Sequence, residues 1–75
     1  MFIVYGTPNC AWCDRSKELL KRHEKAYEYV DVSEDEDART MFIENGYRTV
    51  PQVYDGLNYI GGYEKLEDYL TAISG

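Results

Sequence analysis

The sequence lacks the residues and segments that would mark a metal-binding, secreted or membrane protein. Its 75 residues include two cysteines and one histidine. A closed zinc site needs four ligands, so two cysteines and a distant histidine argue against one, and we expect no metal. The start has no basic segment and too short an apolar stretch for a signal peptide or a membrane span. We therefore expect a cytoplasmic protein, and we interpret His23 as a partly solvated packing residue.

Positive charge is also scarce. Eight lysines and arginines face 14 aspartates and glutamates, which gives a net charge of −6. Phosphate recognition needs a basic face, so this balance argues against binding to nucleic acid or to an anionic membrane surface. There are no repeats, linkers or low-complexity tracts. The length leaves room for one core, so we expect a single domain over residues 1–75 and a monomer.

The apolar pattern predicts the element order βαβαββα. The expected strands are Phe2–Tyr5, Tyr27–Val32, Val50–Tyr54 and Asn58–Ile60. The expected helices are Ala11–Lys25, a helix capped by Ser33 with Glu36 that ends at Gly46, and Tyr63–Ile73. The helical period assigns these residues to the buried faces: Cys13, Ser16, Leu19, Leu20 and His23; Ala38, Met41, Phe42 and Asn45; Leu66, Tyr69, Leu70 and Ile73.

This order predicts an α/β fold with a four-stranded mixed sheet flanked by three helices. The first crossover should be parallel and right-handed. The last two strands should form an antiparallel hairpin around Asp55-Gly56-Leu57.

The cysteines stand two residues apart, after a strand and turn and at the start of a helix. A helix beginning near Ala11 would place the Cys10 sulfur over unpaired backbone N–H groups, which favour the thiolate. A disulfide that closes so short a loop removes little entropy from the unfolded chain, so a structural staple is disfavoured. We interpret Cys10 as a nucleophile and the more sheltered Cys13 as its resolving thiol. The alternative is a pair of small buried apolar side chains.

Three motifs in order resemble the glutaredoxins over essentially the whole chain. They are Cys10-Ala11-Trp12-Cys13 after the first strand, Thr49-Val50-Pro51-Gln52, and Gly61-Gly62-Tyr63. The compact form is similar to glutaredoxins of bacteria and bacteriophages. The resemblance implies a thioredoxin-like fold and a glutathione-dependent thiol–disulfide oxidoreductase. Such an enzyme uses glutathione as co-substrate and reduces glutathione mixed disulfides and protein disulfides, with ribonucleotide reductase as one partner.

The resemblance also implies a binding site for glutathione. Its expected residues are Trp12, Thr49, Val50, Pro51, Gly62, Tyr63 and Glu64. Pro51 should follow a cis bond and face the cysteines, so that the Val50 backbone pairs with a glutathionyl cysteine. Gly62 and Tyr63 should bring helix N–H groups to a carboxylate, and Trp12 should form a wall. The alternatives are an ordinary turn proline, a plain glycine turn and a helix-start aromatic packed against the protein.

The chain departs from the family pattern at three places. Ala11 replaces the usual proline, Thr7-Pro8-Asn9 lacks the usual lysine, and Lys65 stands where an acidic residue is common. Glu64 is a candidate substitute for the acid, and Arg39 or Arg48 for the lysine. These departures keep two further hypotheses open. One is reduction by thioredoxin reductase, and the other is a dimer that bridges a [2Fe–2S] cluster.

Overall fold

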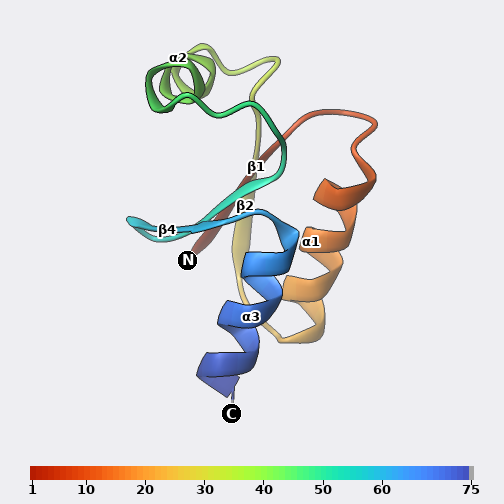
Figure 1. The fold of residues 1–75 in the computed structure, drawn as a ribbon. Helices are drawn as coiled ribbons and strands as arrows, with labels where there is room; N and C mark the ends of the chain where they lie inside the picture. Colours follow the sequence, from red (N-terminus) through yellow and green to blue (C-terminus); the bar gives the residue numbers. More distant parts are fainter. Residues whose placement is uncertain (75) are drawn as a thin grey trace.

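A computed structural model describes residues 1–74, and it has the predicted element order (Figure 1). The elements are β1 (Phe2–Gly6), α1 (Ala11–Arg22), β2 (Tyr27–Asp31), α2 (Glu36–Asn45), β3 (Gln52–Asp55), β4 (Asn58–Gly61) and α3 (Tyr63–Ser74). The described residues include no helix that is both long and apolar enough to cross a membrane.

The strands form one mixed sheet in the order β2-β1-β3-β4. The pairing of β1 with β2 is parallel and that of β3 with β4 is antiparallel, both as predicted. The structure adds an antiparallel pairing of β1 with β3. Helices α1 and α3 lie together on one face, and α2 lies on the other (Figure 1). The predicted mixed sheet is therefore confirmed.

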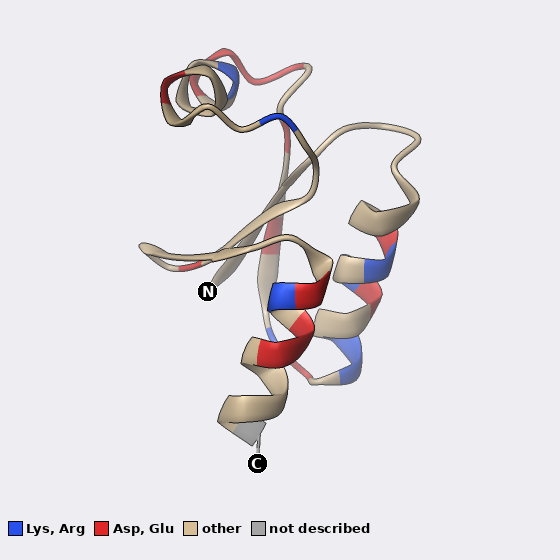
Figure 2. Cartoon of the chain, viewed as in Figure 1, with Lys and Arg blue, Asp and Glu red and all other residues tan. Residues whose placement is uncertain are grey.

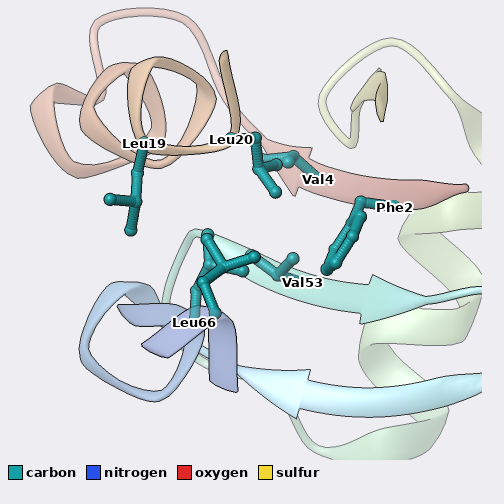
Figure 3. Packing of buried hydrophobic residues seen from close by; sticks show 7 residues of the cluster. Phe2, Val4, Leu19, Leu20, Val53 and Leu66 are labelled. Carbon is teal, nitrogen blue, oxygen red and sulfur yellow. The ribbon is translucent and has the colours of Figure 1, made fainter. Parts of the chain in front are cut away.

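The larger core fills the space between the sheet and the helices α1 and α3. Phe2 and Val4 face α1 and α3, whereas Tyr5 of the same strand packs on the α2 side. Successive strand residues point to opposite faces of a sheet. The buried side chains that meet there are Phe2, Val4, Leu19, Leu20, Val53, Leu66 and Leu70. Figure 3 shows leucines of both helices converging on the strand residues. This packing holds both helices against the sheet, and so sets the position in space of each helix N-terminus.

The first helix ends earlier than predicted. It stops at Arg22, with His23 as C-cap, whereas the prediction continued to Lys25. Glu24 takes a left-handed conformation with φ 56°, and the Glu24 and Lys25 N–H groups donate to the Lys21 and Leu20 carbonyls. This is a Schellman ending, which usually carries glycine at the left-handed position. Because glutamate occupies this position, the sequence carried no recognisable signal for the end of the helix.

The predicted cap of α2 is wrong by two residues. Asp35 is the N-cap, and its carboxylate accepts a hydrogen bond from the Ala38 N–H at 2.9 Å. The Ser33 N–H and hydroxyl instead donate to Asp31 Oδ1 at 2.9 and 2.6 Å. The aspartate two residues earlier thus holds Ser33 in a turn that precedes the helix.

Two residues predicted to be buried are exposed. Asn45 lies at the end of α2, where its side chain donates to the Met41 carbonyl at 2.9 Å. Ile73 is 49% exposed, because it lies beyond the part of α3 that covers the sheet. The third strand also begins at Gln52 rather than Val50. Pro51 has no N–H to donate to a neighbouring strand, so regular pairing begins after it.

Candidate active site

The sheet register brings the three motifs to one edge of the sheet. Tyr5 lies opposite Gln52, so the residues after β1 and the residues before β3 leave the sheet at the same edge. Gly61 lies opposite Val53, and α3 starts at that edge too. Segments far apart in the sequence therefore meet around the cysteines.

Cys10 occupies the start of α1. It is the N-cap residue, in an extended conformation, and its sulfur accepts a hydrogen bond from the Cys13 N–H at 3.1 Å. Asn9 before it takes a left-handed conformation with φ 61°, which turns the chain from β1 into the helix. The predicted placement of the Cys10 sulfur over the helix N–H groups is confirmed.

Cys10 and Cys13 form a disulfide with their Cα atoms 5.2 Å apart. Cys10 is partly exposed, whereas Cys13 is 1% exposed. One sulfur can therefore be reached from solvent while the other is sheltered behind it. This asymmetry favours attack at the Cys10 sulfur, and the division into an attacking and a resolving thiol stays a prediction.

Gly6 provides the space in which the Cys13 sulfur lies. A Cβ atom at residue 6 would stand 2.7 Å from Cys13 Sγ and 3.1 Å from Cε1 of Tyr29. Gly6 is the last residue of β1 and is buried, so space and not backbone freedom requires glycine here. This role was not predicted from the sequence. The available signal was a glycine at the end of an apolar strand, which often marks a close approach.

A cavity of about 330 Å³ opens at the start of α1, where Trp12, which stands between the two cysteines in the chain, lines it and neither cysteine does. Its lining contains every residue of the predicted glutathione site together with Lys65: Trp12, Thr49, Val50, Pro51, Gly62, Tyr63, Glu64 and Lys65. The Val50–Pro51 peptide bond is cis, as predicted. The α1 start, the segment before β3 and the α3 start thus build one wall each of a single cleft.

Trp12 forms an exposed wall of this cleft. It is 49% exposed, and its ring centroid lies 5.3 Å from that of Tyr63 at the start of α3. The Arg15 guanidinium lies 4.6 Å from the Trp12 ring centroid, within the range of a cation–π contact. The Trp12 ring therefore contacts a side chain of α1 and a side chain of α3, and about half of its surface stays exposed.

The cleft lining carries one charge of each sign, on Glu64 and Lys65. Figure 2 shows acidic and basic residues side by side on α1 and α3. Lys17 pairs with Asp14 at 3.4 Å and lies 4.3 Å from the Tyr29 ring centroid. The close partners of Lys17 are thus an acid and an aromatic ring. We therefore expect the helix N–H groups to contribute more positive potential at Cys10 than Lys17 does.

The two arginines considered as substitutes for the missing lysine lie outside the cleft lining. Arg39 is on α2, where its guanidinium donates to the Ser33 carbonyl at 3.0 Å. Arg48 is exposed next to Thr49 but is not among the residues that line the cavity. Lys65 is the cation that the structure brings to the cleft.

Comparison with known proteins places this site in a family. A family model described as glutaredoxin matches residues 2–60. Glutaredoxin 1 of Rickettsia conorii is 35% identical over 69 residues, which cover 88% of this chain and 68% of that protein. The hybrid peroxiredoxin hyPrx5 of Haemophilus influenzae is 34% identical over 70 residues, and the chain spans 28% of its length.

The fold agrees with that assignment. The crystal structure of a buckwheat glutaredoxin–glutathione complex superposes with a TM-score of 0.78 at 24% identity, covering 95% of this chain and 68% of that one. Its fold is the thioredoxin-like arrangement that the sequence predicted. The family model, the Rickettsia relative and the disulfide at the start of α1 lead to one conclusion. The chain belongs to the glutaredoxin family and is a thiol–disulfide oxidoreductase with a CxxC redox disulfide.

Proposed function

We propose that the protein reduces glutathione mixed disulfides and protein disulfides through Cys10 and Cys13, with glutathione as the reductant. The observation that carries this proposal is the cleft at the start of α1, in which three separate segments place Trp12, the Thr49–Pro51 wall and the start of α3. Trp12 stands two residues after the partly exposed Cys10. Such a concave site with a few convergent polar groups suits a small ligand.

The forward half-reaction transfers two electrons to the substrate. The Cys10 thiolate attacks one sulfur of the substrate disulfide, the S–S bond breaks, and the leaving thiolate takes up a proton. The substrate then remains joined to Cys10. Cys13 gives its proton to solvent and attacks Cys10 Sγ, which releases the second substrate thiolate and forms the Cys10–Cys13 disulfide. Two glutathione thiolates reverse these steps and leave as glutathione disulfide.

The cleft offers each part of glutathione a suitable partner. The backbone of Val50 lies next to the cis proline and can pair with the cysteinyl backbone of the ligand. The N–H groups at the start of α3, near Gly62 and Tyr63, suit a carboxylate. Glu64 and Lys65 add one charge of each sign, which suits a tripeptide with one ammonium and two carboxylates. The glutathione complex of the buckwheat relative supports this assignment.

Disulfide-containing proteins are the proposed final substrates, ribonucleotide reductase among them. Partial exposure of Cys10 lets its sulfur meet a disulfide on a protein surface. Reduction of such substrates needs a thiol pool, so we propose that the protein acts in the cytoplasm. We propose that it acts as a monomer and without a metal.

The test compares two sources of electrons. Turnover of a glutathionylated peptide is measured with glutathione, glutathione reductase and NADPH, and then with thioredoxin reductase and NADPH alone. We expect turnover in the first system and little in the second. The opposite result would replace glutathione by thioredoxin reductase as the electron source, and Lys65 in the cleft would then be the residue to examine.

A further inference from the structure

Gln52 is a buried polar side chain directly behind the cleft. It is 6% exposed and follows the cis proline at the start of β3. Burying an amide costs free energy unless its donors and acceptor find partners. Gln52 Nε2 donates to the Thr49 carbonyl at 3.1 Å and lies 3.3 Å from the Thr49 hydroxyl. The amide therefore holds a residue that lines the cleft.

The other end of the amide is held by a tyrosine outside the cleft. The Tyr59 hydroxyl, on the edge strand β4, donates to Gln52 Oε1 at 2.6 Å. The Thr49 carbonyl can only accept, so it sets the orientation in which the Gln52 NH₂ faces Thr49. The Tyr59 hydroxyl then holds the amide oxygen at the opposite end. Tyr59 thus anchors the side chain that holds Thr49.

The same tyrosine supports the loop from its other side. The Tyr59 ring stacks on Tyr47, with ring centroids 5.4 Å apart and 16° between the ring planes. Tyr47 precedes Thr49 by two residues and packs edge-on against Phe42 of α2. Tyr47 and Gln52 flank the Thr49–Pro51 wall, and both contact Tyr59. The Tyr59 residue is nevertheless 51% exposed, so it supports the fold through these two contacts more than through buried surface.

We propose that Tyr59 and Gln52 are positioning residues that hold the Thr49–Pro51 wall in its ligand-binding conformation. This inference rests on the proposed use of the cleft for glutathione. It assigns to Tyr59 an effect on substrate binding and none on the reactivity of Cys10, because the hydrogen bonds lead to Thr49 and not to the cysteines.

The test replaces Tyr59 by phenylalanine, which keeps the ring and removes the hydroxyl. The matched control is Tyr69→Phe, which removes a hydroxyl bonded to Asp55 at 2.5 Å and away from the cleft lining. For Tyr59→Phe we expect KM for a glutathionylated peptide to rise about two- to tenfold, the range that one neutral hydrogen bond corresponds to. The kcat and the rate of Cys10 alkylation should stay unchanged. For Tyr69→Phe, KM should stay unchanged.

A second measurement does not depend on glutathione. In Tyr59→Phe, the backbone amide NMR shifts of Thr49 and Val50 should change, whereas Tyr69→Phe should leave them in place. An unchanged KM together with unchanged amide shifts would overturn the positioning role. Absence of turnover in the unmodified protein would refute the proposed function instead, and the amide shifts would still test the positioning role. In a Gln52→Met background, Tyr59→Phe should raise KM no further; an equal further rise would also overturn the proposal.

Discussion

Replacing Gly6 by alanine tests whether the Cys13 sulfur requires a glycine behind it. The added Cβ would lie 2.7 Å from Cys13 Sγ, which is closer than real side-chain contacts allow, so the sulfur or the strand must move. Forcing an extra carbon into a packed interior costs about 1–3 kcal/mol. Alanine also restricts the unfolded chain more than glycine does, which offsets about 0.4–1 kcal/mol of this cost. We therefore expect Gly6→Ala to lower the free energy of unfolding by about 1–2 kcal/mol.

The assay is urea unfolding of four proteins: the unmodified chain, Gly6→Ala, Cys13→Ala and the double variant. Without the sulfur, the remaining close contacts of the new Cβ are Tyr29 Cε1 at 3.1 Å and Cys13 Cβ at 3.2 Å, which small shifts can relieve. The cost of Gly6→Ala should then fall by at least half in the Cys13→Ala background. An equal cost in both backgrounds would refute the reasoning, because the penalty would come from the strand and not from the sulfur.

Three further predictions concern the thiols and the tyrosines. Cys10→Ser should abolish disulfide reduction, because no other described sulfur stands at the helix start; substantial turnover in the coupled assay would contradict the assigned nucleophile. Cys13→Ser should keep the reduction of glutathione mixed disulfides, because a glutathione thiolate can release Cys10 from its disulfide with glutathione in place of Cys13. It should weaken the reduction of protein disulfides, and equal loss of both activities would show that Cys13 does more than resolve the mixed disulfide. Stability should fall as pH rises above about 10. Burial raises the pKa of Tyr5, Tyr29, Tyr47 and Tyr59, and the bond to Asp55 raises that of Tyr69. The unfolded chain then loses tyrosine protons at lower pH than the folded one, so an unfolding midpoint that stayed constant from pH 9 to about 11 would contradict the shifts.

Periodicity was enough to predict the element order, and it was clearest in β1, α1 and α3, which bury apolar residues at regular spacing. Leu19 and Leu20 on α1 and Leu66 and Leu70 on α3 are buried as their spacing required. The errors at the ends of the helices arise where local geometry decided the outcome. Asp31 draws Ser33 into a turn, and Glu24 ends α1 in a conformation that glutamate seldom adopts.

The candidate site divides in the same way. Cys10, Trp12 and Pro51 stand in short motifs whose chemistry can be recognised along the chain, and the structure gathers their segments into one cleft. Gly6 lies outside the three motifs, and Gln52 ends one of them without a role that the motif indicates. Their roles depend on distances to Cys13 and Thr49 across the fold, and no pattern of neighbouring residues encodes those distances.

The strand register explains why three short motifs are enough to build the cleft. The pairing of Tyr5 with Gln52 makes the chain leave β1 where it enters β3, and the pairing of Val53 with Gly61 makes it leave β4 at that same edge. A slip of β3 by one residue would turn Gln52 toward α1 and α3 and Val53 toward α2. The core residue Val53 would then lose its contacts with Leu20 and Leu66, so the packing that stabilises the domain also fixes the Thr49–Pro51 wall beside Cys10.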